Sequence, residues 1–130
     1  MRYPIFIFDG DDLAVYETHE DHWNSLESYQ IDYPEIILDS DGRLLTKEDA
    51  GDVRVRLVDS GAEPDTERLR TLLLHSLKVR RQSWPSDASL ECLIAGAQAR
   101  QRWDDEYRRF RIGRVIGWLL NLLHLKRRPS

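Results

Sequence analysis

The chain has 130 residues and a formal net charge of −4, with 41% hydrophobic and 32% charged residues. This length and composition suit one folded domain with a single core, and the chain is too short for two catalytic lobes. Its one cysteine, Cys92, excludes an internal disulfide and a cysteine-based zinc cluster, and it fits a reducing compartment.

The charges are distributed unevenly along the chain. Residues 1–65 contain 17 acidic and 5 basic side chains, a balance of −12, whereas residues 66–130 contain 6 and 14, a balance of +8. Two explanations stay open: one face binds a basic partner, or the two halves dock and partly neutralise each other. In either case we predict a single domain, 1–130. It consists of an acidic sheet portion at 1–60 and a basic helical portion at 61–130.

The segment IFIFDGDDLAVYE, residues 5–17, predicts a β-hairpin. Apolar, β-forming runs at 3–8 and 13–17 flank the stretch Asp9-Gly10-Asp11-Asp12. Glycine takes a positive φ without strain and aspartate tolerates turn geometry, so this stretch is typical of a tight turn.

A helix is expected directly after the hairpin. Thr18 suits its N-cap, and Glu20 and Asp21 follow in the first turn, where negative charge is favourable. Apolar and aromatic side chains then recur at helical spacing at His19, His22, Trp23, Leu26 and Tyr29. This helix would bury Trp23 and expose its acidic side.

Three further strands are expected before residue 60. The segments 35–39 and 43–45 lie on either side of a turn at Ser40-Asp41-Gly42. In the third segment Val53, Val55 and Leu57 alternate with Arg54 and Arg56, which indicates a half-exposed strand.

After Gly61 the apolar period changes from two to about 3.6 residues. The pattern predicts a helix that opens at Pro64 and two more helices, at 88–110 and 113–125. The whole order predicts an α+β fold, in which a small, mostly antiparallel ββαβββ module is followed by three helices that pack on it.

The last apolar segment runs from Val115 to Leu125 and is followed by Lys126, Arg127 and Arg128. Crossing a bilayer takes about 20 apolar residues, so we expect no transmembrane segment. A final core helix is the main interpretation, and a basic amphipathic helix on a membrane surface is the alternative.

Asp9 and Asp11 have the spacing of the nucleophile and second carboxylate of haloacid-dehalogenase-like phosphatases. Such an enzyme also needs a cation for the phosphoryl group and further acids for Mg²⁺ on later parallel strands. The chain lacks the alternating βαβα pattern of that sheet. We therefore interpret Asp9 as a turn residue and expect no enzyme activity.

Two metal sites can be drawn from the sequence, and neither is favoured. Asp39, Asp41, Gly42 and Glu48 match four positions of a calcium-binding EF-hand loop, but Ile37 stands at the first position and the flanks resemble strands. His19 and His22 lie one helical turn apart beside Glu17 without an indicated third ligand. We expect no metal and no cofactor.

The basic half contains a possible nucleic-acid surface. Arginines at 100, 102, 108, 109, 111 and 114 alternate with Trp103, Tyr107 and Phe110. The acidic remainder of the chain would repel phosphate at long range, and aromatic side chains at this spacing usually belong to a core. A nucleic-acid-binding or regulatory adaptor is therefore an alternative, not the main interpretation.

The order IFIFDGDDLAVYETHEDHWNSLE followed by EIILDSDGRLL resembles the opening module of small bacterial immunity proteins encoded beside polymorphic or type VI-secreted toxins. The resemblance covers about residues 3–48. It implies a cytoplasmic antitoxin that inactivates a cognate toxin by covering its active site, and that takes part in bacterial competition.

Physical chemistry supports an acidic inhibitor as well. A toxin that acts on nucleic acids or nucleotides has a basic cleft, which a fixed set of carboxylates can occupy while accelerating association. We expect these carboxylates on the turns and on the polar side of the first helix. The predicted partner-binding residues are Asp11, Asp12, Glu20, Asp21, Asp39 and Asp41.

Overall fold

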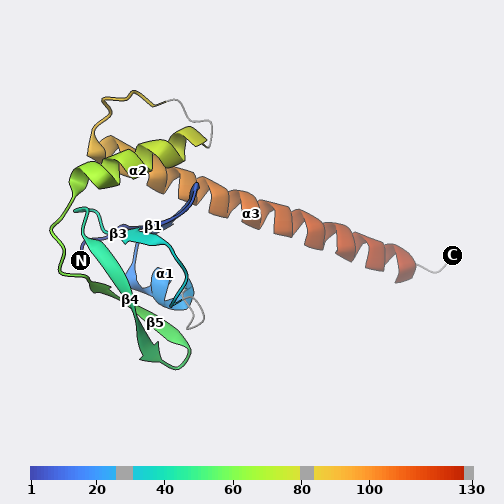
Figure 1. The fold of residues 1–130 in the computed structure, drawn as a ribbon. Helices are drawn as coiled ribbons and strands as arrows, with labels where there is room; N and C mark the ends of the chain where they lie inside the picture. Colours follow the sequence, from blue (N-terminus) through green and yellow to red (C-terminus); the bar gives the residue numbers. More distant parts are fainter. Residues whose placement is uncertain (26–30, 80–83, 128–130) are drawn as a thin grey trace. The chain divides into compact units, whose positions relative to one another are not determined.

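A computed structural model describes residues 1–25, 31–79 and 84–127 (Figure 1). Its elements are, in chain order, β1 (Ile5–Asp9), β2 (Asp12–Tyr16), α1 (His19–Ser25), β3 (Ile36–Leu38), β4 (Leu44–Gly51), β5 (Arg54–Asp59), α2 (Thr66–Val79) and α3 (Leu90–Arg127). The α+β prediction is confirmed. The chain forms two compact units, Met1–Gln98 and Ala99–Ser130, which we describe separately.

The first unit contains a five-stranded sheet with the order β2-β1-β3-β4-β5. Each of its four strand pairs is antiparallel. The predicted hairpin is confirmed: Asp9 pairs with Asp12, which leaves Gly10 and Asp11 as a two-residue turn. Gly10 has a φ of +58°, the conformation for which glycine is suited.

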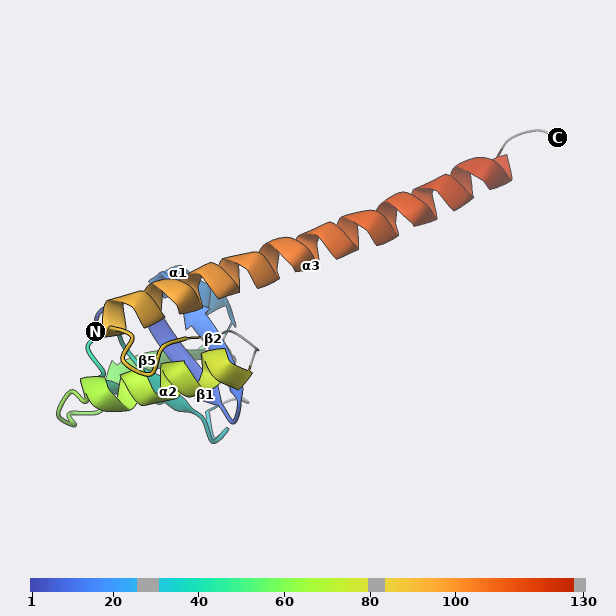
Figure 2. The same ribbon diagram turned by 90° about the horizontal axis from the view of Figure 1, so that it is seen from above.

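One face of the sheet carries the larger part of the core. Phe6 and Phe8 alternate with Ile5 and Ile7 along β1, so they lie on opposite faces. The Phe6 face packs against α2 and the first residues of α3 (Figure 2). The buried helical side chains in this cluster are Leu69, Leu73, Leu77, Leu93 and Ala97.

The opposite face is also buried. Ile5, Ile7 and Ile37 form a second apolar cluster with residues of β4 and β5. His22 of α1 has only 1% of its surface exposed. Because both faces are covered, residues of both parities along β1 are apolar, which explains the uninterrupted run IFIF.

The boundaries of some elements differ from the prediction. β4 extends to Gly51, well beyond the strand expected at 43–45, because it pairs with β5 along most of its length. The separate helices expected at 88–110 and 113–125 are wrong, since α3 continues from Leu90 to Arg127. Gly113 does not end it, because one glycine costs a helix only about 1 kcal/mol. Leu26 and Tyr29 lie outside the described residues.

The turn between β3 and β4 is built around one buried carboxylate. Asp39 Oδ1 accepts hydrogen bonds from the backbone N–H groups of Asp41 and Arg43, both at 2.9 Å, and Oδ2 accepts one from Arg2 at 3.0 Å. Gly42 has a φ of +78°, and a Cβ there would lie 2.4 Å from the backbone oxygen of Asp65. The turn therefore depends on the Asp39 carboxylate as a hydrogen-bond acceptor and on glycine at position 42, where a side chain would collide with the backbone.

Candidate functional site

The six predicted partner-binding carboxylates do not form one cluster. Asp11 and Asp12 lie at the β1–β2 turn, whereas Asp39 follows the residue that pairs with Phe6, near the other end of β1. The ends of β1 are about 14 Å apart at 3.4 Å per residue. Glu20 and Asp21 follow β2 beyond Tyr16, which pairs with Ile5, so they belong to the far end as well.

The expectation that Asp39 is exposed is wrong. Its surface is 0% exposed, and its carboxylate accepts the three backbone hydrogen bonds described above. Asp41 remains partly exposed and forms an ion pair with Arg2, with 3.1 Å between Oδ1 and Nη1. The Asp-x-Asp-Gly pattern thus holds a turn, and Asp39 is not available to a partner.

Glu20 and Asp21 are exposed at the start of α1. Thr18 Oγ1 accepts a hydrogen bond from the Asp21 N–H, and Asp21 Oδ2 accepts one from the Thr18 N–H. This reciprocal pair is a capping box, and it confirms the predicted N-cap at Thr18. Part of the Asp21 carboxylate is therefore already occupied within the chain.

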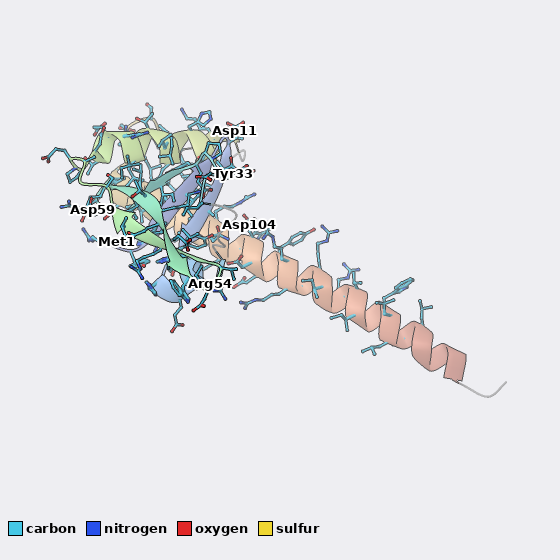
Figure 3. The ribbon with its side chains drawn as sticks, turned by 60° about the horizontal axis from the view of Figure 1, so that its bottom comes forward. Met1, Asp11, Tyr33, Arg54, Asp59 and Asp104 are labelled. Atoms are coloured by element: carbon cyan, nitrogen blue, oxygen red, sulfur yellow. The ribbon has the colours of Figure 1, made fainter. Side chains whose placement is uncertain are left out.

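A different grouping lies at the β1–β2 turn, and we name it the hairpin-end surface: Asp9, Asp11, Asp12 and Tyr33. The Tyr33 hydroxyl donates a hydrogen bond to Asp9 Oδ2 at 3.0 Å. Tyr33 is 50% exposed, and the side chain of Asp11 is 69% exposed. Figure 3 shows Asp11 and Tyr33 at one end of the sheet, with Met1 and Asp59 toward the other.

A buried ion pair holds Tyr33 in this position. Lys47 Nζ of β4 donates to Glu35 Oε1 and to the backbone oxygen of Tyr33, both at 2.9 Å. The Lys47 and Glu35 side chains are only 7% and 8% exposed. The segment that carries Tyr33 is thereby fixed to the sheet, so the aromatic ring is held in place before any partner binds.

Asp11, in the β1–β2 turn, forms a contact with helix α2. His75 Nε2 of α2 lies 2.9 Å from Asp11 Oδ1, with both side chains largely exposed. An exposed pair of this kind contributes at most about 1 kcal/mol. It orients the Asp11 carboxylate and leaves it accessible.

The electrostatics of the hairpin-end surface are acidic. The hydrogen bond to Asp9 and the negative charge of Asp9 raise the pKa of Tyr33, and Glu35 and Asp12 add to the effect. The phenol therefore stays protonated and neutral at physiological pH. The surface combines an exposed aromatic side chain with three neighbouring carboxylates, a combination suited to arginine and lysine side chains of a partner.

Tyr33 was not identified from the sequence. The available signal was an aromatic residue directly before Pro34, where the backbone is restricted to extended conformations. Asp9, interpreted as a turn residue, is the last residue of β1 and accepts the Tyr33 hydrogen bond.

The surroundings of Asp9 and Asp11 differ from those of the phosphatase alternative. That fold places its nucleophile on a parallel sheet, whereas β1 lies between two antiparallel neighbours, β2 and β3. Asp9 binds Tyr33 and Asp11 binds His75, so the two carboxylates do not share one ligand position.

The structure does not arrange the EF-hand-like residues as a calcium-binding loop. Glu48 lies in β4 and Asp39 is committed to the turn, so the EF-hand pattern is not a helix-loop-helix site. Over the part of the chain that the structure describes, no group of three or more potential metal ligands occurs.

The histidines of α1 pack together rather than facing solvent as a pair. The rings of His19 and His22 meet edge to face at 4.7 Å between centroids, and His19 stacks on Trp23 at 5.8 Å. His22 Nδ1 forms a 3.1 Å hydrogen bond with the Tyr3 hydroxyl. Burial and the neighbouring His19 lower the pKa of His22, although Asp21 acts in the opposite direction.

The second unit consists of the remaining length of α3. Arginine side chains lie against its aromatic rings, with Arg100 at 5.3 Å from Trp103, Arg111 at 5.9 Å from Tyr107 and Arg114 at 5.7 Å from Phe110. These aromatic side chains are exposed, as are Val115, Ile116 and Leu119. The expectation of a core helix at 113–125 is wrong for the residues whose side chains are described.

No helix among the described residues combines the length and the apolar character needed to cross a membrane.

Comparison of the chain with protein-family models, with curated proteins and with solved structures finds no match. The feature of the described residues that bears most directly on function is the acidic hairpin-end surface with its exposed tyrosine.

Proposed function

We propose that this chain is an immunity protein that neutralises a cognate bacterial toxin, in the cytoplasm of a bacterium that uses polymorphic or type VI-secreted toxins. It would bind through the hairpin-end surface and occlude a basic active-site cleft, without catalysing a reaction. The observation that carries this proposal is the exposed Tyr33, held among the carboxylates of Asp9, Asp11 and Asp12 by a buried ion pair.

The physical basis is preorganisation. Interface residues that contribute most to affinity are often tyrosines in fixed positions, and complementary charge around them accelerates association. Because Lys47 already holds the Tyr33 segment on the sheet, little conformational entropy is lost on binding. Glu20, Asp21 and Asp41 at the other end of the sheet would be peripheral contacts, and Asp39 would make none.

The test uses the product of the neighbouring reading frame as the candidate toxin. Association and dissociation rates with the full chain are measured by surface plasmon resonance at several salt concentrations. The double variant Asp11→Lys/Asp12→Lys is expected to slow association about tenfold or more at low salt, and the difference should shrink as salt increases.

Two further variants make the test specific. Glu63→Lys/Asp87→Lys changes the net charge equally at exposed positions away from the hairpin, and it should slow association much less. Tyr33→Ala should accelerate dissociation about 30-fold, as for an aromatic anchor worth about 2 kcal/mol. If both double variants associate at the same rate, or if the chain binds nucleic acid and no toxin domain, the proposal is wrong.

A further inference from the structure

The second unit carries most of the exposed apolar surface of the described chain. Ten of the fourteen exposed large hydrophobic side chains lie in α3 between Trp103 and Leu122. Phe110 and Trp118 are each 62% exposed, and Leu120 is 60% exposed. A run of exposed apolar side chains like this one is typical of a binding surface, because its exposure to water is unfavourable.

Between Ile112 and Leu122 the large apolar side chains leave one narrow stripe of the helix free. Gly113, Gly117 and Asn121 follow each other at intervals of four residues and therefore lie along one side. At 3.6 residues per turn, large apolar residues between Ile112 and Leu122 occupy most of the remaining circumference. They are Ile112, Val115, Ile116, Trp118, Leu119, Leu120 and Leu122. This part of α3 has a wide apolar side and a narrow small or polar side.

The charge of the same region has one sign. Residues 107–130 contain seven Lys or Arg and no Asp or Glu. Arg111 and Arg114 lie against the rings of Tyr107 and Phe110, so their cationic groups border the apolar side chains directly. Long arginine side chains can remain in contact with apolar surface while their charged ends reach a polar boundary.

The charge favours one occupant for this surface. A second copy of the chain would bring seven more positive charges to the same apolar segment, with no acidic residue of that segment to compensate them. An anionic bilayer presents negative headgroups beside an apolar interior, which complements both features. Lys and Arg near such a surface each strengthen binding, and tryptophan prefers the interface between headgroups and hydrocarbon.

The length of the segment determines how it would bind. Residues 112–125, between Arg111 and Lys126, span about 21 Å as a helix, which is shorter than the hydrocarbon core of about 30 Å. We propose that the segment 107–127 binds the surface of an anionic lipid bilayer with its axis parallel to the membrane. From Ile112 onward the apolar side enters the interface. The stripe of Gly113, Gly117 and Asn121 faces water together with Phe110, which lies on the same side three residues before Gly113.

The proposal is tested by flotation of the full chain with lipid vesicles. Vesicles of phosphatidylcholine mixed with phosphatidylglycerol should bind the chain, and vesicles of phosphatidylcholine alone should bind it at least about tenfold more weakly. Leu119→Asp places a carboxylate on the apolar side and should abolish binding. Asn121→Asp adds the same charge on the opposite side of the helix and should retain most of it.

Arg108→Gln/Arg109→Gln should weaken binding to the mixed vesicles about tenfold or more, with a smaller effect at high salt. The proposal is wrong if binding does not depend on phosphatidylglycerol or if Leu119→Asp binds like the parent chain. It is also wrong if vesicles do not bind and sedimentation shows self-association that Leu119→Asp removes, because a second copy would then cover the surface. None of these outcomes depends on the toxin partner.

Discussion

Asp39 connects two parts of the chain through one buried carboxylate. The backbone N–H of Arg2 near the N-terminus and the backbone N–H groups of Asp41 and Arg43 in the turn donate hydrogen bonds to it. Buried backbone donors that lose an acceptor are costly, at about 1 to 3 kcal/mol for a group left unpaired.

We therefore expect Asp39→Ala to lower the free energy of unfolding by about 3 kcal/mol or more, measured by urea denaturation. Asp41→Ala, two residues away, removes only an exposed ion pair with Arg2 and should cost less than about 1 kcal/mol. Equal effects of the two substitutions would contradict the structural role of Asp39.

His22 is the buried histidine of α1. Its imidazole is 1% exposed, its Nε2 has no hydrogen-bond partner among the residues that the structure describes, and its pKa is lowered from the ordinary value of 6.5. Protonation is thus more favourable in the unfolded chain than in the folded one. The stabilisation by neutral His22 is complete above about pH 6.5 and decreases as the pH falls toward the lower folded-state pKa.

The melting temperature should accordingly fall between pH 7 and pH 5. His22→Gln should reduce this pH dependence, although it also lowers stability at pH 7 through the lost contact with Tyr3. His75→Gln removes an exposed imidazole and should leave the pH dependence of His22 in place. A parent protein whose melting temperature does not change over this range would contradict the argument.

At the scale of elements, the β4–β5 hairpin is strained where the β1–β2 hairpin is not. Gly51 pairs with Arg54, so Asp52 and Val53 form the two-residue turn, with φ values of 50° and 56°. The expectation that Val53 belongs to the strand is therefore wrong, since β5 begins at Arg54. A β-branched residue rarely adopts a positive φ, whereas glycine does so without strain. Val53 is also 68% exposed and gains little from packing.

Val53→Gly should therefore raise the free energy of unfolding by about 1 kcal/mol. The reverse substitution at the other hairpin provides the control. Gly10 has a φ of +58° and no atom within 4 Å of a Cβ, so Gly10→Val should lower stability through backbone strain alone. Thermal unfolding of both variants measures the two effects, and a destabilised Val53→Gly would overturn this account of the turn.

The long helix α3 passes through two different environments. Leu93 and Ala97, near its start, belong to the core of the first unit, whereas its residues from Trp103 to Leu122 present exposed apolar side chains. No proline interrupts α3 between Leu90 and Arg127, so the helix does not end where its environment changes.

At the scale of the whole molecule, the two units carry opposite charge. Residues 1–98 have a balance of −10 and residues 99–130 a balance of +6, which together reproduce the net charge of −4. The two proposed partners differ accordingly, with a basic protein for the acidic unit and an anionic bilayer for the basic one. Increasing salt is expected to weaken both interactions, because each depends on exposed charges.

Local features were predictable from the sequence. The Asp-Gly turn after β1, the N-cap at Thr18 and the apolar periods of α2 and β5 depend on residues close together in the chain, so short patterns determine them. The continuity of α3 through residues 110–113 was not predictable. A glycine such as Gly113, without a proline or a capping residue beside it, does not decide whether a helix ends.

The sequence by itself determined the α+β class, the β1–β2 hairpin, the turn between β3 and β4, and the separation of acidic from basic residues. Only the tertiary structure decided that Asp39 is buried, that Asp11 and Glu20 lie toward different ends of the sheet, and that Tyr33 binds Asp9. The reason is strand register: pairing between β1 and β3 joins residues more than 20 positions apart, and no local pattern encodes which of them meet.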